Sequence, residues 1–349
     1  MAHEFTYFPR NTDRVATLFL DANVVSLLDS VVNKGSAFGG ATGGVEQRER
    51  VADLLSRIGD ARINVMAGLG AAEGDIRPDP RDTDNSNFYR RSARAQSLLN
   101  ENRDQLRRWA AREDVEPISV DSEAERAAEI EAAFIPTVDY YIRPLYALVL
   151  QTYLIYLTGR HDPMDALRAL NEYAAETRLR GSWGMKLACL LLAGTTEGRQ
   201  LALSIMKFPD ASSGELSYAQ TVKNAWNTSF DLVYSHLATA IPTWGAGVPE
   251  PVVFITADQP LSAFLNMVTP LGGAQTSDGT VLPLNAAFPD GTIRDDLYED
   301  VAQLMLDATA ATYYESLPAE RVQEIRRVKS LEHAERLEQL FKERHASEE

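Results

Sequence analysis

The chain is organised around residues 16–29, whose sequence is Ala-Thr-Leu-Phe-Leu-Asp-Ala-Asn-Val-Val-Ser-Leu-Leu-Asp. Residues 17–20 predict a short strand buried on both faces, which is typical of a central parallel strand in an α/β sheet. Residues 24–32 predict a helix. Asp21 therefore follows the carboxyl end of a strand, where open α/β sheets bind their ligands. Asp is also a common helix N-cap, so this motif alone does not establish a catalytic role.

The composition is that of a globular protein with one large domain or two. The chain has 349 residues, 45% of them hydrophobic, which is enough for a sizeable core. Its single cysteine, Cys189, excludes a disulfide framework and a Cys-rich zinc site, and it favours a reducing compartment. Residues 1–10 lack an apolar signal segment, and the apolar run at 145–157 is too short to span a bilayer. We therefore expect a cytoplasmic protein with no membrane partner.

Charge limits the kinds of substrate. The formal net charge of −16 repels nucleic acid and anionic membranes, so a polyanionic substrate requires a local basic patch or a metal site. Residues 77–112 contain nine arginines, no lysine and five acids. Arginine suits phosphate because its planar fork binds two oxygens at once. The candidate substrate contacts in this stretch are Arg90, Arg91, Arg94, Arg107 and Arg108. The equally strong alternative is a solvated helix face with ordinary ion pairs.

Strand and helix patterns alternate up to residue 135. After a glycine-rich connection at 34–44, which lacks the Gly-Lys-Ser/Thr ending of a phosphate loop, an amphipathic helix is expected at 46–58. Residues 62–66 predict a second strand, and a run of small residues then leads to Glu73. A third strand is expected at 115–120, followed by a helix at 123–134.

The second half of the chain favours long helices. Residues 136–223 show few strand signals, and the apolar segment around Cys189 is expected in the core. Asp231 lies midway along an otherwise apolar helix, where a carboxylate is expensive to bury without a partner. Residues 251–256 then predict another apolar strand, which runs through Thr256 and Ala257 to Asp258 and a helix. This repeats the strand–acid–helix arrangement of Asp21.

The C-terminal part predicts a helix at 295–314 and a charged helix from about residue 320 onward. The apolar positions of the last helix form a narrow stripe: Val322, Ile325, Val328, Leu331, Leu337 and Leu340. A stripe of this kind favours docking on the protein's own body or on a partner helix. Fraying in solvent remains the alternative near a chain end.

Four pieces of the chain occur in the order of a known family. They are residues 18–23, 65–73, 230–239 and 253–258, and residues 115–128 add a similar strand and helix. With these pieces the chain resembles PIN-domain proteins, which are metal-dependent nucleases with a Rossmann-like fold. The resemblance implies an α/β architecture: a PIN-type parallel sheet flanked by helices, with an α-helical insertion and C-terminal helices.

The resemblance also implies a division of the chain. It places the first part of the PIN-like domain at 1–135, a helical insertion at 136–223, the second part of the domain at 224–290, and a C-terminal helical extension at 291–349. The insertion leaves the substrate class more open than the fold.

The resemblance implies one acidic site. The residues that would bind metal and catalyse are Asp21, Glu73, Asp231 and Asp258. Asp75 stays an alternative to Glu73, and Asn23 and Thr256 are expected to hold a carboxylate or water in place. A pair of carboxylates about 4 Å apart costs about 4 kcal/mol at an effective dielectric constant of about 20. A divalent ion removes that penalty, and carboxylate and water ligands favour Mg²⁺ or Mn²⁺.

The resulting hypothesis is a metal-dependent endonuclease that hydrolyses phosphodiester bonds, in RNA rather than DNA. A regulatory protein partner and a homo-oligomer are left open. One alternative is a PIN-like scaffold that binds RNA or protein without cutting. Another is a haloacid-dehalogenase-like phosphohydrolase, but it requires an acid where Asn23 stands and a lysine between Thr256 and Arg294, where none occurs. The five histidines give no support for a Ser-His-Asp triad.

Overall fold

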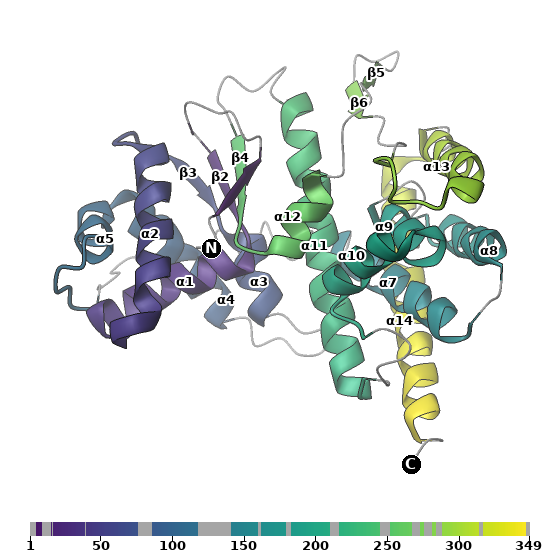
Figure 1. Cartoon of the computed structure of the whole chain (residues 1–349), viewed down its shortest axis with the longest axis horizontal. Helices are drawn as coiled ribbons and strands as arrows, with labels where there is room; N and C mark the ends of the chain where they lie inside the picture. Colours follow the sequence, from purple (N-terminus) through teal and green to yellow (C-terminus); the bar gives the residue numbers. More distant parts are fainter. Residues whose placement is uncertain are drawn as a thin grey trace. The chain divides into compact units, whose positions relative to one another are not determined.

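The computed structural model of the chain describes residues 5–8, 15, 17–38, 40–75, 86–117, 141–159, 162–178, 183–209, 216–244, 252–266, 273–275, 281–283, 288–313 and 317–346. The chain forms two compact units (Figure 1). Unit 1 comprises residues 1–135 and 237–262, and unit 2 comprises residues 136–236 and 263–349. The helical unit thus begins at residue 136, where the insertion is expected, but it also includes residues 224–236 and 263–349.

Unit 1 contains a four-stranded mixed sheet with the strand order β1-β4-β2-β3. The strands are β1 (Thr6–Phe8), β2 (Thr17–Leu20), β3 (Asn64–Met66) and β4 (Val252–Thr256). Strand β2 is parallel to both β3 and β4, and β1 is antiparallel to β4. Leu18 on β2 faces Val65 on one side and Val253 on the other, and all three are buried. The prediction that residues 17–20 form a central parallel strand is confirmed.

Five α-helices lie wholly within the described part of unit 1, which also includes the end of α11 (Tyr218–Trp244) and the start of α12 (Gln259–Asn266). The five are α1 (Ala22–Lys34), α2 (Gly40–Ile58), α3 (Gly68–Asp75), α4 (Ser86–Asn100) and α5 (Arg103–Ala110). Helices α1, α3 and α4 pack on one another beside the strands, and α2 packs on α5 (Figure 1). Helix α1 ends at Gly35, whose φ of 49° lies in the left-handed region that favours glycine. The carbonyl of Gly35 accepts a hydrogen bond from Trp109 Nε1 at 3.1 Å, which ties the end of α1 to α5.

Several local predictions for unit 1 need correction. Strand β1 was not expected, because its three residues are too few to show a period. Helix α2 begins at Gly40, inside the expected glycine-rich connection, although glycine has a low helix propensity. Further along the helix, Arg48 ties α2 to α5 by donating to the carbonyl of Trp109. The arginine-rich segment is two helices rather than one. Asn102 breaks it with non-helical dihedrals, and its side chain donates to Ser97 Oγ at 2.9 Å.

The third predicted strand is not confirmed in the part that the structure describes. Residues 115–117 form no strand, and residues 118–120 and the helix expected at 123–134 lie outside the described residues. The described sheet has four strands and is mixed, because β1 is antiparallel to β4. Together with its helices, it is compatible with an α/β fold for unit 1.

Unit 2 is mainly helical. Its elements are α7 (Arg143–Leu157), α8 (Pro163–Glu176), α9 (Trp183–Ala193), α10 (Thr196–Met206), most of α11 (Tyr218–Trp244), the end of α12 (Gln259–Asn266), the hairpin β5 (Gly273–Gln275) and β6 (Val281–Pro283), the 3₁₀ turn η4 (Asp295–Leu297), α13 (Tyr298–Tyr313) and α14 (Ala319–Ala346). The core expected around Cys189 is confirmed, because nearly every side chain of α9 is buried. No helix in the described ranges has the length and apolar content needed to cross a bilayer.

The C-terminal helix α14 docks on the body of unit 2, as one of the sequence alternatives proposed. It packs along α7, with Leu337 and Phe341 buried, whereas Val328 and Leu340 of the predicted stripe are exposed. Glu338 accepts hydrogen bonds from two tyrosines, Tyr146 at 2.7 Å and Tyr218 at 3.0 Å. At the C-terminal end of α14, the buried face therefore contains Phe341 and not the predicted Leu340.

Candidate functional site

The best-defined acidic site lies in unit 1, where two adjacent parallel strands end. Asp21 follows β2 and Asp258 follows β4, and each begins a helix. Asp21 Oδ1 accepts from Val24 N at 2.8 Å and so caps α1. Its Oδ2 accepts from Ala257 N at 3.0 Å and from the hydroxyl of Thr256. Asp21 thus joins the ends of both strands, and only 2% of its surface is exposed.

Thr256 links the two acids. Its hydroxyl donates to Asp21 and accepts from the backbone N–H of Asp258 at 2.9 Å. Asp258 Oδ1 in turn accepts from Leu261 N at 2.9 Å and caps α12. The sequence prediction assigned Thr256 to holding a carboxylate in place, and its hydrogen bond to Asp21 agrees with that role.

The ionisation of Asp21 reflects these surroundings. Burial raises its pKa above the ordinary value for aspartate, and the nearby negative charge of Asp258 raises it further. The hydrogen bonds from Thr256, Val24 and Ala257 act in the opposite direction, because they stabilise the charged form. Asp258 is therefore close enough for its charge to disfavour ionised Asp21, and a bound cation would relieve that repulsion.

Helix α3 touches the same end of the sheet. A Cβ atom added to Gly70 would lie 2.6 Å from the carbonyl oxygen of Leu20 and 2.7 Å from that of Asp21. The small residues of the segment are explained by this contact, because a larger side chain would push α3 away from the strand end. Glu73 lies one turn further along α3 and is half-buried. The side chain of Asp75, the alternative acid, lies outside the described residues.

Two other predicted residues take no part in the hydrogen bonds that connect Asp21 and Asp258 in the described structure. Asn23 is exposed on the first turn of α1, and the described residues offer its side chain no hydrogen-bond partner. Asp231 belongs to unit 2, where it is 5% exposed and forms an ion pair with Lys207 at 4.0 Å. The expectation that a carboxylate buried in this apolar helix needs a partner is confirmed.

Two of the candidate substrate arginines on α4 form ion pairs with α1. Arg94 Nη1 lies 3.1 Å from Asp29 Oδ1, and Arg91 Nε lies 3.9 Å from Asp29 Oδ2. Arg91 also donates to Ser26 Oγ at 2.6 Å. These contacts hold α4 to α1. Arg90, the next residue along α4, is exposed.

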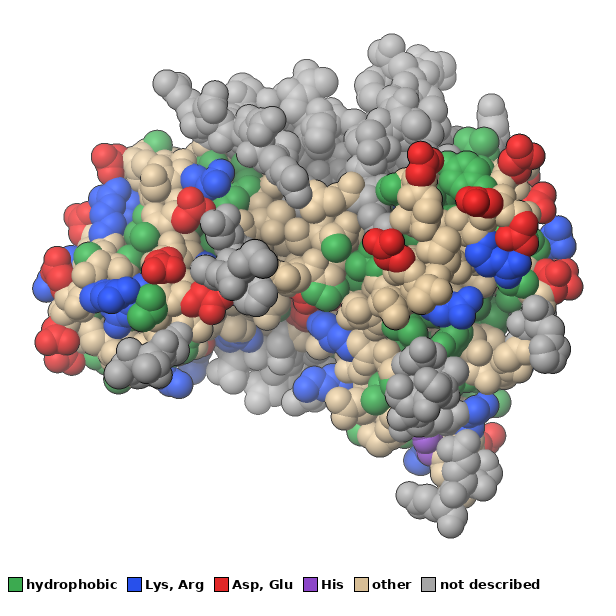
Figure 2. Space-filling view, in the orientation of Figure 1, with side chains coloured by type: hydrophobic (Ala, Val, Ile, Leu, Met, Phe, Trp, Pro, Cys, Tyr) green, Lys and Arg blue, Asp and Glu red, His purple; other side chains and the backbone are tan. Residues whose placement is uncertain are grey.

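The two candidates on α5 also have acidic partners. Arg107 pairs with Asp104 at 2.9 Å and with Asp60, and Arg108 pairs with Glu113 at 2.7 Å. The face of the molecule shown in Figure 2 has acidic and basic side chains interspersed over its described surface. Four of the five arginines therefore match the ion-pair alternative, which leaves Arg90 as the strongest candidate for a phosphate contact.

Within the described ranges, no group of three or more His, Cys, Asp or Glu side chains is placed to hold a metal ion. The acidic site of unit 1 thus contributes fewer carboxylates than the four-acid hypothesis requires. Its oxygen atoms belong to carboxylate and hydroxyl groups, which suit hard ions such as Mg²⁺ or Mn²⁺ and not soft ones.

Comparison with known proteins gave no match, either to a protein-family model, to a curated protein or to a solved structure. The function proposed below therefore rests on the geometry around Asp21 and Asp258.

Proposed function

We propose that unit 1 is a Mg²⁺- or Mn²⁺-dependent endonuclease that hydrolyses phosphodiester bonds in RNA, with Asp21 and Asp258 at its centre. The observation that supports this proposal most directly is the chain of hydrogen bonds Asp21–Thr256–Asp258 across two adjacent strand ends. Open α/β sheets bind ligands at this edge. Two acids within electrostatic reach of each other form a site that a cation stabilises.

The residues present suit a magnesium site of the kind used in phosphoryl transfer. Mg²⁺ is commonly bound by one or two protein carboxylates and completed by water and substrate phosphates, so a third acid is not required. Asp258 and Asp21 supply the pair, and Glu73 is the next acid along the edge that α3 contacts. A bound ion would polarise a phosphoryl oxygen and lower the pKa of the attacking water.

The protein residues have separate tasks in this proposal. Asp21 is fixed by three donors and so holds the turn from Thr256 to Asp258 in a single conformation. Thr256 keeps the backbone of Asp258 in place, and Arg90 is exposed for contact with a phosphate. Asp231 remains the fourth acid implied by the resemblance. RNA as substrate, a regulatory protein partner and a cytoplasmic location belong to the same proposal.

The test is cleavage of RNA with Mg²⁺ or Mn²⁺, with and without EDTA. Asp258→Asn keeps the cap on α12 but removes the charge, and we expect activity to fall at least about 100-fold. Asp162→Asn is a matched control, because Asp162 Oδ1 caps α8 by accepting from Asp165 N at the same 2.9 Å. Equal activity of the two variants, or cleavage that EDTA does not affect, would contradict the proposal.

A second candidate is a PIN-like scaffold that binds RNA or a protein without cutting. It is favoured by the completeness of the contacts around Asp21, which caps a helix and clamps two strands with only 2% of its surface exposed. RNA retention in a gel-shift experiment without any metal-dependent cleavage would select this candidate over the nuclease.

A further inference from the structure

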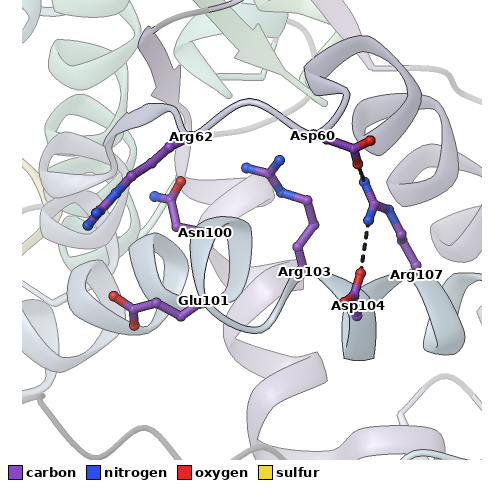
Figure 3. Close-up of a pocket in the computed structure, with 7 residues that line it drawn as sticks. All are labelled: Asp60, Arg62, Asn100, Glu101, Arg103, Asp104 and Arg107. Atoms are coloured by element: carbon purple, nitrogen blue, oxygen red, sulfur yellow. Dashed lines mark hydrogen bonds and ion pairs between the residues drawn. The ribbon is translucent and has the colours of Figure 1, made fainter.

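A polar pocket of about 400 Å³ lies in unit 1 between the turn that precedes β3 and the junction of α4 with α5 (Figure 3). Its lining consists of Asp60, Arg62, Asn100, Glu101, Arg103, Asp104 and Arg107. The volume lies in the range of small-molecule sites. Three arginines and three acids contribute to it, so the availability of each charge decides what the pocket can bind.

Arg103 is the buried cation of the pocket, with 6% of its surface exposed. Its Nε donates to the Leu99 carbonyl at 2.8 Å, and its Nη1 donates to the carbonyls of Gly59 at 2.8 Å and Ala61 at 2.9 Å. These bonds use three of the five guanidinium N–H groups. The described residues provide no acceptor for Nη2 and no acid within ion-pair distance of Arg103.

The acids on one side of the pocket are already paired. Arg107 binds both Asp60 and Asp104, as the dashed lines in Figure 3 show. Burial lowers the pKa of Arg103, and the positive charge of Arg107 lowers it further. The charge of Arg103 therefore remains without a direct counter-ion in the described structure, although two carboxylates are nearby.

The other side of the pocket contains Arg62, which is exposed and has no ion-pair partner among the described residues. Figure 3 shows Arg62 on the side opposite Arg107, with Arg103 between them. Asn100 forms the wall there, because its amide exchanges hydrogen bonds with the backbone of Ile63 at 3.0 and 3.1 Å. Its polar atoms are thus committed to the fold, which leaves Arg62 and Arg103 Nη2 as the available donors.

We propose that this pocket binds a small molecule through a phosphate or carboxylate group that Arg103 Nη2 holds. Arg62, whose guanidinium points away from that of Arg103 in Figure 3, adds a positive charge to the same lining. A two-oxygen anion matches the planar donors of a guanidinium, and it supplies the counter-ion that Arg103 lacks. Glu101 and the acids beside Arg107 surround the same space, so an extended polyanion such as RNA is disfavoured.

This site is separate from the acidic site. The pocket adjoins the amino-terminal end of β3, whereas Asp21 and Asp258 follow the carboxyl ends of β2 and β4, which are parallel strands of the same sheet. Arg103 already fixes the turn at Gly59 and Ala61, so an anion on Arg103 would further stabilise that turn. Binding is therefore expected to raise the melting temperature of unit 1, whether or not the protein cleaves RNA.

The test is calorimetric titration of the full chain with inorganic phosphate and, separately, with citrate, at constant ionic strength. Arg62→Gln is expected to weaken binding by about 10-fold or more, since it removes a positive charge from the lining. Glu101→Gln is expected to strengthen binding, because it removes a negative charge from the lining. Arg108→Gln is the control, because Arg108 lies on α5 but pairs with Glu113 outside the pocket.

Arg103→Lys keeps a positive charge but replaces the planar guanidinium with a single ammonium group, and its folding is checked by circular dichroism. Weaker binding in both Arg62→Gln and a folded Arg103→Lys, with unchanged binding in Arg108→Gln, would support the proposal. If Arg103→Lys does not fold, the contrast between Arg62→Gln and Arg108→Gln decides. Absence of saturable binding of both anions, or equal binding in those two variants, would overturn it. Asp258→Asn leaves this pocket intact, so failure of the nuclease proposal and failure of the anion site are distinguishable.

Discussion

Two ionisable side chains, one buried in each unit, differ in their hydrogen bonding. Asp21 in unit 1 receives three hydrogen bonds, two of them from backbone N–H groups. Lys186 in unit 2 is 4% exposed, and its ammonium has no hydrogen-bond acceptor in the described structure. Lys186 Nζ instead lies 5.1 Å from the ring centre of Trp183 and 5.6 Å from that of Phe288.

The difference follows from where each charge lies on its element. Asp21 stands at a helix start, where backbone N–H groups have no partner within the helix, so a carboxylate satisfies them. Lys186 stands inside α9, where the carbonyls are already used by the helix. Burial lowers the pKa of Lys186 from 10.5 to about 8. Burial disfavours the charged form of both residues, since it raises the pKa of Asp21 and lowers that of Lys186. Only at the helix start do backbone N–H groups offset part of that penalty.

The largest loss of stability is expected from Asp21→Ala. It leaves the N–H groups of Val24 and Ala257 and the hydroxyl of Thr256 without their acceptor, so we expect a loss of about 3–5 kcal/mol in the free energy of unfolding. Urea denaturation measures it. Asn23→Ala, two residues away and exposed, should change stability by no more than about 0.5 kcal/mol. Similar effects of the two variants would refute the special position of Asp21.

The converse change is Lys186→Met, which keeps the volume and removes the charge. Burial lowers the pKa of Lys186 from 10.5 to about 8, so its charge destabilises the folded protein at pH 7. We therefore expect the methionine variant to gain about 3 kcal/mol in the free energy of unfolding. The matched control is Lys329→Met, because Lys329 is half exposed and pairs with Glu332 at 3.2 Å. A loss of stability in Lys186→Met would show that the contacts with the two rings outweigh the burial penalty.

The burial of Lys186 also makes the stability of the protein depend on pH. The folded pKa of Lys186, about 8, lies below the unfolded value of 10.5. Between these values the unfolded state binds more protons, so the contribution of Lys186 makes stability rise with pH, by up to about 1.4 kcal/mol per pH unit. The stability advantage of Lys186→Met over the natural chain should therefore shrink from pH 8 to 10.5. A constant difference across that window would contradict the lowered pKa.

A smaller effect is expected from Thr256→Val, which removes the hydroxyl between the two acids. Asp21 loses a donor and the N–H of Asp258 loses an acceptor, so we expect a loss of about 1–2 kcal/mol by urea denaturation. Thr256→Ser keeps the hydroxyl and should lose less. Equal losses in both variants would show that packing of the methyl group, not the hydrogen bonds, explains the effect.

The long apolar runs predicted the fold best. Strands β2 and β4, and the acid and helix after each, were predicted from the sequence because both faces of these strands are buried. Strand β1 was missed because its three residues carry too little periodic signal, whereas β3, which is equally short, was predicted as part of the five-residue stretch 62–66. The start of α2 at Gly40 was missed because glycine has a low helix propensity, so a glycine-rich stretch favours a loop.

The candidate site was predictable where it depends on strand ends and not where it depends on distant pairing. Asp21, Thr256 and Asp258 come together because their strands are neighbours. Arg91 and Arg94 both pair with Asp29 on α1, and Arg94 lies 65 positions further along the chain. The spacing of residues within α4 could not predict a pairing over such a distance in sequence. The arginine pocket and the buried Lys186 had no signal beyond charged residues in ordinary contexts.

If the acids at the ends of β2 and β4 bind a divalent ion, calorimetric titration with Mg²⁺ or Mn²⁺ detects that binding. We expect a saturable site in the natural chain and in Asp162→Asn that is lost in Asp258→Asn. Undiminished binding by Asp258→Asn, or no binding by the natural chain, would contradict the proposed metal site.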